Sequence, residues 1–303
     1  MKCDLDSRLV VGVSTRTLFD LTFENNIFEQ QGLEAYCQYQ IEHEEEILKP
    51  GPGFTLVKAL LAINDLPGEK ERVEVVIMSH NNADTSVRFF RSIAYYGLHI
   101  TRAVFSGGSP LTPYLSAFKT DLFLSANEED VQQAVDSGIA AGIICVDGQC
   151  RYDADSSIGQ IRIAFDGDAV LFSDESEEIY KREGLEAFEE NERKKAASPL
   201  GEGPFARFLK TIAALQKEFS GNEVPIRTAL VTSRCAPAHE RVVRTLRAWN
   251  VRIDESFFLG GISKRDILAA FGAHIFFDDQ EIHTGKAAEV VTAARVPIRR
   301  KAG

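Results

Sequence analysis

Cysteine is scarce in this chain, and its distribution argues against a disulfide framework. The 303 residues include five cysteines, an odd number scattered along the sequence: Cys3, Cys37, Cys145, Cys150 and Cys235. Such usage is typical of reduced thiols, so we expect a cytoplasmic location. Cys145 and Cys150 lack the second cysteine or histidine pair of a zinc site, and we interpret them as structural thiols.

Long apolar runs are also missing. No segment approaches the length of about 20 apolar residues that a membrane helix requires. The start, Met1–Asp6, carries no apolar core of the kind found in signal peptides. We therefore expect no membrane partner.

Positive charge is in deficit. A net charge of −11 argues against a nucleic-acid polymer as partner, because phosphate backbones require a basic surface. The basic tail Arg299–Lys301 is expected to be a solvated end. A small phosphate ester stays compatible with this charge, since its site needs only a metal ion and one or two cations. A homo-oligomer also stays possible.

The sequence repeats itself. The block Gly32–Tyr36 returns as Gly184–Phe188, at an offset of 152 that becomes 153 farther along. In this register three apolar strands and a Gly-Gly pair fall on their counterparts: 10–13 on 162–165, 75–78 on 228–231, 105–108 on 258–261 and 118–124 on 271–277. We predict two copies of one unit, residues 1–150 and 151–303, joined near the polar stretch 147–159.

Each copy alternates strands and helices. In the second copy we predict one strand that ends at Asp166, further strands over 228–231, 256–259, 273–277 and 290–296, and helices over 238–249 and 263–271. The alternation predicts an α/β fold with parallel sheets covered on both faces. Ligands of such sheets bind at the carboxyl ends of the strands.

Two aspartates follow the first strand of the second copy. Apolar residues lead into the pair in Arg-Ile-Ala-Phe-Asp166-Gly-Asp168-Ala-Val. One carboxylate in such a pair can attack phosphorus and the other can move a proton, while both attract a hard cation such as Mg²⁺. Asp-Gly is also a turn dipeptide, so an acidic turn without function is the alternative.

Polar residues also follow the later strands of this copy. Thr232 follows the second strand, Lys264 begins a predicted helix, and Asp278-Asp279 follow the strand at 273–277. Singly, these positions could be a turn, a solvated helix residue and a helix N-cap pair. Phosphoryl transfer needs a nucleophile, a metal ion and donors for the phosphoryl oxygens; the ordered set offers the nucleophile, the donors and acidic residues that would complete a magnesium site. We therefore predict a site.

In this order, the residues resemble the four motifs of the haloacid dehalogenase (HAD) superfamily of phosphatases. More narrowly, strings along almost the whole chain resemble the cytosolic 5'-nucleotidase type I family: 13–20, 121–131, 163–177, and 276–280 with His283. The resemblance implies two tandem HAD-like Rossmannoid units with parallel sheets. Each unit would carry a mostly helical cap after its first strand, over about 21–72 and about 174–226.

The resemblance also implies catalytic roles. Asp166 would attack phosphorus and form an aspartyl-phosphate, and Asp168 would protonate the leaving nucleoside oxygen and later deprotonate water. Thr232 would hold the phosphoryl oxygens, and Lys264 would neutralise charge on them and on the nucleophile.

A magnesium site is implied as well. Asp166, the backbone carbonyl of Asp168, and Asp278 with or without Asp279 would bind Mg²⁺. The resemblance favours hydrolysis of a nucleoside 5'-monophosphate such as AMP. The rivals are another HAD phosphatase or phosphotransferase on a small phosphate ester, and a nucleotide-binding regulatory protein.

The first copy lacks this chemistry. In the matched register neutral or basic residues replace the acids and the lysine: Ser14 for Asp166, Arg16 for Asp168, Leu111 for Lys264, and Ser125 and Ala126 for Asp278 and Asp279. Only Ser79 keeps a chemical counterpart, Thr232. We predict a pseudo-catalytic unit, whose role could be packing support, closure of the active cleft or binding of an effector.

The predicted caps contain two related Gly-Pro loops that end at Phe54 and Phe205. Either ring could stack on a base, but a phenylalanine at a helix start is more often part of the core.

Overall fold

The described residues form one continuous ten-stranded sheet. The structure, a computed structural model, describes residues 5–68, 71–145, 158–219 and 224–300. The strand order is β3-β2-β1-β4-β5-β10-β9-β6-β7-β8. The strands are β1 (Leu9–Val13), β2 (Val73–Ser79), β3 (Arg102–Phe105), β4 (Leu122–Ser125), β5 (Ala140–Ile144), β6 (Ile161–Phe165), β7 (Ile226–Thr232), β8 (Glu255–Phe258), β9 (Ile275–Asp278) and β10 (Thr292–Arg295).

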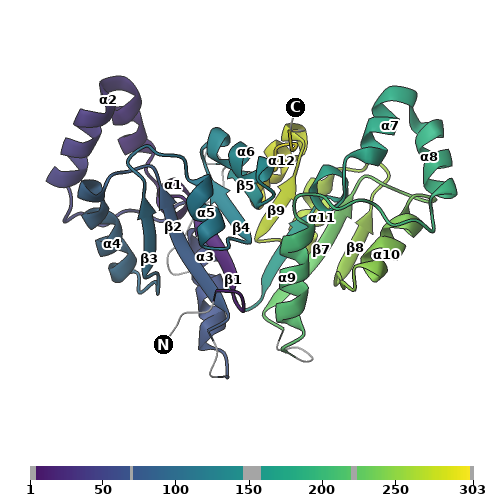
Figure 1. Cartoon of the computed structure of the whole chain (residues 1–303), viewed down its shortest axis with the longest axis horizontal. Coiled ribbons are helices and arrows are strands. Elements are labelled where there is room, and N and C mark those ends of the chain that lie inside the picture. Colours follow the sequence, from purple (N-terminus) through teal and green to yellow (C-terminus); the bar gives the residue numbers. More distant parts are fainter. Residues whose placement is uncertain (1–4, 69–70, 146–157, 220–223, 301–303) are drawn as a thin grey trace.

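Helices connect the strands and cover the sheet (Figure 1). In chain order they are α1 (Thr15–Leu18), α2 (Thr22–Glu42), α3 (Phe54–Ala62), η1 (Ile63–Asp65), η2 (Ala83–Thr85), α4 (Ser86–Tyr95), α5 (Thr112–Ala117), α6 (Glu128–Asp136), η3 (Gly167–Leu171), α7 (Glu175–Glu183), α8 (Leu185–Lys194), α9 (Ala206–Gln216), α10 (His239–Ala248), α11 (Lys264–Phe271) and α12 (Glu281–Ala287). All five residues of β1 are buried, and alternate ones enter different core clusters: Leu9, Val11 and Val13 in one, Val10 in the other. The predicted α/β class with a mostly parallel sheet is confirmed.

The sheet differs in one respect from the separate parallel sheets that were expected. β5 pairs antiparallel with β10, with Ala294 opposite Ile144, whereas the other neighbouring strands are parallel. The pairing covers the backbone of two strands that would otherwise be exposed edges. Gly142 permits the close approach, because a Cβ there would lie 2.9 Å from the Cβ of Ala294.

The two sides of this joint have the same strand order. From the joint outward, the first half-sheet is β5-β4-β1-β2-β3 and the second is β10-β9-β6-β7-β8. Helical segments after β1 and β6 stand at the two upper corners of the molecule, α2 on the left and α7–α8 on the right (Figure 1).

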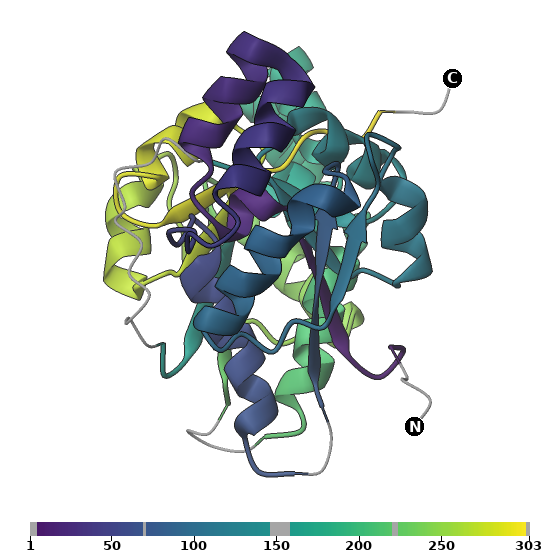
Figure 2. The same cartoon turned by 90° about the vertical axis from the view of Figure 1, so that its left-hand side faces the viewer.

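A glycine bends each of these helical segments at the same place. Gly32 lies within α2 at φ 88° and ψ −178°, and Gly184 separates α7 from α8 at φ 84° and ψ −175°. Glycine adopts this positive φ without steric cost. Figure 2 shows the two arms of α2 that result, at the top of the molecule.

Phe54 and Phe205 lie in the core. Both are fully buried, and the ring of Phe205 packs against those of Phe165, Phe208 and Phe277. The alternative that either ring stacks on a base is wrong, because neither ring has a face open to a ligand.

Expectations from composition can be compared with the described residues. No helix among them is long and apolar enough to cross a membrane. Cys37, Cys145 and Cys235 are free thiols, while Cys3, Cys150, Lys301 and most of the predicted junction lie outside the described residues.

Gly203 offers a test of the close backbone contact between the loop after α8 and η3. Its N–H donates to the carbonyl of Leu171 at 2.9 Å, and a Cβ there would lie 2.4 Å from the carbonyl oxygen of Val170. We expect Gly203→Ala to lower the free energy of unfolding by about 1–3 kcal/mol, the usual cost of overpacking, in urea denaturation.

Gly285→Ala is the matched control. No atom lies within 4 Å of a Cβ at this position in α12, so the variant should keep wild-type stability or gain up to about 1 kcal/mol from helix propensity. Equal losses in both variants would contradict the close contact at Gly203.

Candidate active site

The predicted site residues meet where the strands of the second half-sheet end. Asp166 directly follows β6, Thr232 ends β7 and Asp278 ends β9. β6 lies between β7 and β9, and all three are parallel, so their carboxyl ends share one edge of the sheet. Lys264, the first residue of α11, extends to the same place.

Lys264 joins two of the aspartates. Its Nζ lies 2.7 Å from Oδ1 of Asp166 and 2.6 Å from Oδ2 of Asp278, and all three side chains are buried. Burial alone would lower the pKa of Lys264, but the two carboxylates raise it, so the ammonium group stays charged. Because a buried charge without a partner is strongly destabilising, the three groups depend on one another.

Asp278 is the most strongly fixed acid of the cluster. Its carboxylate accepts hydrogen bonds from Lys264 and from the backbone N–H of Gln280, at 2.6 and 2.9 Å. The Nδ1 of His283 lies 3.2 Å from Oδ2. Burial raises the pKa of Asp278, but the hydrogen bonds from His283 and Lys264 outweigh it and bring the pKa below its usual value.

The pKa values of Asp166 and Asp279 are raised rather than lowered. Burial and the neighbouring Asp278 raise the pKa of Asp166 to about 7, against the effect of Lys264. Burial and the nearby acids raise the pKa of Asp279 to about 8. For both acids, burial and the neighbouring carboxylates outweigh the positive charge of Lys264.

The same carboxylates fit a metal ion. Oxygen atoms of Asp166, Asp278 and Asp279 lie within 4.8 Å of one another. Oδ1 of Asp279 is buried, and none of the residues that the structure describes gives it a hydrogen bond. Buried polar atoms without a partner are rare, and a hard cation with oxygen ligands would satisfy this one.

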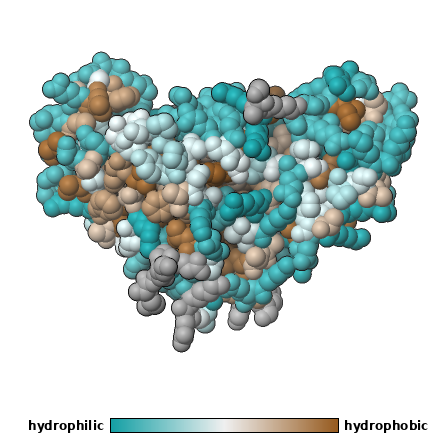
Figure 3. All heavy atoms as spheres, viewed as in Figure 1, coloured by the Kyte–Doolittle hydropathy of each residue, from teal (hydrophilic) through white to brown (hydrophobic). Residues whose placement is uncertain are grey.

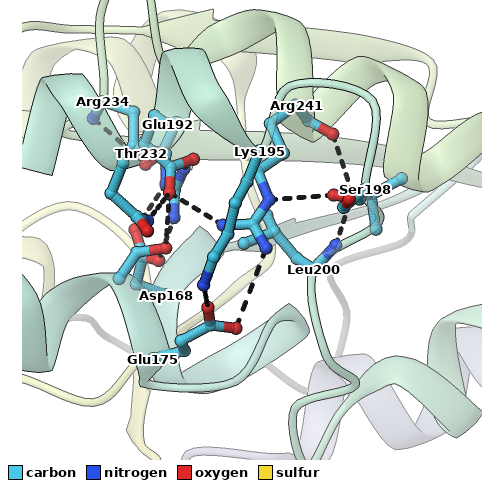
Figure 4. Close-up of polar contacts among 12 residues, drawn as sticks. Asp168, Glu175, Glu192, Lys195, Ser198, Leu200, Thr232, Arg234 and Arg241 are labelled. Carbon is cyan, nitrogen blue, oxygen red and sulfur yellow. Dashed lines mark hydrogen bonds and ion pairs between the residues drawn. The ribbon is translucent and has the colours of Figure 1, made fainter.

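Asp168 lies beside this cluster and is held by an arginine. The guanidinium of Arg234 donates to both carboxylate oxygens of Asp168, from Nε at 2.7 Å and from Nη2 at 2.6 Å (Figure 4). Such bidentate pairs fix orientation as well as distance. The backbone N–H of Arg234 donates to the hydroxyl of Thr232 at 3.2 Å, which ties the arginine to the end of β7.

The arginine continues into a buried network. Nη1 of Arg234 lies 2.6 Å from Glu192 on α8, whose other oxygen accepts from Arg241 on α10 at 2.9 Å (Figure 4). The same oxygen accepts a hydrogen bond from Ser176 on α7 at 2.8 Å. Glu192 has no exposed side-chain surface. Burial raises its pKa, but the two arginines and Ser176 lower it further, so the pKa lies below its usual value. The network fixes α7 and α8 relative to Asp168.

The structure thus brings together Asp166, Thr232, Lys264, Asp278 and Asp279, with Asp168 at their side. Sequence reasoning missed Arg234, Glu192 and Arg241. Glu192 lies in the run Glu189–Lys195, whose composition is that of a solvated helix. The one available signal was that Arg234 follows Thr232 by two residues.

The chain is similar to known proteins along almost its whole length. A sequence model of the 5'-nucleotidase family matches residues 1–302. The chain is 40% identical to human cytosolic 5'-nucleotidase 1B in an alignment of 303 residues that covers 97% of this chain and 49% of that protein. The chain therefore spans about half the length of this relative.

The buried network predicts a large effect of Glu192→Gln on stability. The substitution keeps the shape of the side chain but leaves Arg234 and Arg241 without their shared anion. We expect the free energy of unfolding at neutral pH to fall by about 3 kcal/mol, measured by chemical denaturation. Glu190→Gln on the exposed side of α8 is the control and should leave the denaturation midpoint unchanged.

Acidification should reduce the difference in the free energy of unfolding between the wild type and Glu192→Gln. A glutamate whose pKa is lowered by folding contributes its full stability above its ordinary pKa of 4.5 and loses it as the pH falls through the folded pKa. Denaturation curves from pH 7 downward should therefore converge below that value. A gap that stays constant would contradict an ionised Glu192.

Proposed function

The chain belongs to the 5'-nucleotidase family, and from this premise we propose that it hydrolyses nucleoside 5'-monophosphates, AMP-like, to nucleoside and phosphate. The observation that carries the proposal is the cluster of Asp166, Asp278 and Asp279 around Lys264 at the strand ends. A carboxylate nucleophile, an ammonium group and a set of oxygen ligands are the parts that transfer of a phosphoryl group requires.

For the fold we propose two tandem HAD-like Rossmannoid units, residues 1–150 and 151–303. The caps would be about 21–72 and about 174–226, with the first unit pseudo-catalytic. The equal strand order of the two half-sheets supports this division, as do the matching bends at Gly32 and Gly184.

The cofactor in this proposal is Mg²⁺. Asp166, Asp278, Asp279 and the backbone carbonyl of Asp168 would hold it, and the buried oxygen of Asp279 without a partner among the described residues supports this choice. When bound, the ion would supply the positive charge that lets an anionic nucleophile approach a phosphate ester.

In the proposed reaction the Asp166 carboxylate attacks phosphorus and forms an aspartyl-phosphate. The bond between phosphorus and the nucleoside oxygen breaks, and Asp168 gives its proton to that oxygen. Asp168 then takes a proton from the water that hydrolyses the acyl phosphate. Lys264 and the Thr232 hydroxyl hold the phosphoryl oxygens throughout.

Arg234 has a distinct part in this scheme. Its guanidinium donates to both oxygens of Asp168 and so fixes that carboxyl group beside the cluster, where the leaving oxygen would receive its proton. The contact of Arg234 with Glu192 would keep the arginine in place.

We also propose a location in the cell. The human relative is called cytosolic, and the described cysteines are free thiols, which together support a cytoplasmic location. A homo-oligomer stays compatible with the proposal.

A panel of phosphate esters tests the substrate class. With Mg²⁺, nucleoside 5'-monophosphates should release phosphate, and an excess of EDTA should abolish the release because the carboxylates then repel the substrate. Turnover of sugar phosphates without turnover of any nucleotide would refute the proposal.

Asp166→Asn tests the nucleophile. The amide keeps the shape of the side chain but cannot attack phosphorus, so phosphate release from AMP should fall by at least about a thousandfold. Asp266→Asn, an equal substitution at an exposed position of α11, should keep wild-type turnover. A variant at 166 that retained activity would exclude the covalent route.

A further inference from the structure

The strand ends of the first half-sheet surround a cavity of their own. It has a volume of about 450 Å³, and its lining includes Ser14 and Arg16, which follow β1, and Ser79 and Asn81 at the end of β2. This volume is within the range of small-molecule sites, which is about 300–1,000 Å³. The established family and the mechanism above assign nothing to it.

The cavity occupies the place that the acidic cluster has in the second half-sheet. Ser125 ends β4 as Asp278 ends β9, and both side chains accept a hydrogen bond from the backbone N–H two residues later, at 3.1 and 2.9 Å. Ser79 and Thr232 likewise accept one from the N–H two residues later, at 3.2 Å in both cases. The backbone frame of the site is therefore present, with hydroxyl groups where the second half-sheet has carboxylates.

The charge of the frame is reversed. Arg16 stands at the position of Asp168, and Asn81 at the position of Arg234. Among the residues that the structure describes, none accepts a hydrogen bond from the guanidinium of Arg16 or forms an ion pair with it, although Arg16 is half-buried and lines the cavity. The acid that lines the cavity, Asp130, is paired with His80 at 2.6 Å. An arginine in this state provides a site for an anion without a metal ion.

The opposite wall of the cavity is apolar and comes from α2. Phe28 and Tyr36 meet edge to face, with ring centroids 6.1 Å apart, and Leu33 lies beside them. The hydroxyl of Tyr36 accepts hydrogen bonds from Gln40 and Asn81, both at 3.0 Å, which fixes its ring. Phe28 keeps 48% of its surface exposed. Figure 3 shows apolar atoms over α2 at the upper left of the molecule.

We propose that this cavity binds a nucleoside 5'-phosphate without a metal ion. The phosphate would contact Arg16 and the hydroxyl groups of Ser14 and Ser79, and the ring system would pack against Phe28 and Tyr36. The choice of a nucleotide rests on the proposed function, whereas the pairing of an anion subsite with an aromatic wall rests on the cavity itself.

Calorimetric titration of the full chain in EDTA tests the proposal, because the carboxylate cluster without metal repels phosphate. The probes are AMP, adenosine and inorganic phosphate, and AMP should bind with one site per chain. Arg16→Ala should weaken the binding of AMP by about tenfold or more, because a hydrogen bond to a charged group usually contributes that much. Arg91→Ala, at an exposed arginine of α4 outside the cavity lining, is the control and should leave the affinity unchanged.

Phe28→Ala tests the aromatic wall separately. Because the ring is half exposed, its loss should not unfold the chain, which thermal denaturation will verify. The variant should bind AMP and adenosine about fivefold or more weakly but should bind inorganic phosphate with unchanged affinity.

Two results would overturn the proposal. One is the absence of AMP binding in EDTA. The other is an AMP affinity that is unchanged in Arg16→Ala but lost in Thr232→Val, which would locate the ligand in the second half-sheet. Phosphate release with Mg²⁺ is measured independently, so failure of the cavity and failure of the nucleotidase proposal are distinguishable.

Discussion

The ammonium group of Lys264 is the contact on which the arrangement of the site depends. β6 and β9 are neighbours, so the acids that follow them must lie together, and Lys264 is within 2.7 Å of Asp166 and 2.6 Å of Asp278. One positive charge cannot balance three carboxylates. The remaining imbalance is expressed in the raised pKa values of Asp166 and Asp279 and in the unpartnered oxygen of Asp279, as far as the described residues go. This excess of negative charge is the physical argument for the proposed Mg²⁺.

A second charged network connects the site to the helical segment after β6, and the first half-sheet has a close relative of it. In the second, Glu192 on α8 supplies the anion that holds Arg241. In the first, Arg88 is held by Glu24 of α2 at 2.8 Å, while Gln40 accepts only one hydrogen bond from it, at 3.1 Å. Both networks satisfy a buried arginine, but only the second has a carboxylate with an oxygen left for Arg234. That extra oxygen is what couples the helical segment to Asp168.

Much of this could be predicted from the sequence, for a definite reason. Asp166, Thr232 and Asp278 each follow an apolar run, and carboxyl ends of parallel strands meet at one edge, so order along the chain was sufficient. The pairing of β5 with β10 could not be predicted, since it consists of two residue pairs without a local pattern. Glu192 was hidden for a different reason. Glu192 is buried by α10 and by the loop after β7. The sequence does not show that these elements cover it, so the charged run predicts a solvated helix.

The two half-sheets illustrate how one frame accommodates opposite chemistry. The turn after β9 needs an acceptor for a backbone N–H, and Asp278 provides it; in the turn after β4 the hydroxyl of Ser125 does the same at nearly the same distance. Because either group satisfies the backbone, a change between them leaves the turn intact and alters only the charge that faces the ligand. The fold therefore constrains the hydrogen-bonding role of these positions and leaves their charge free. For this reason the second half-sheet can present carboxylates to a cation while the first presents hydroxyl groups and Arg16, with no difference in strand order between them.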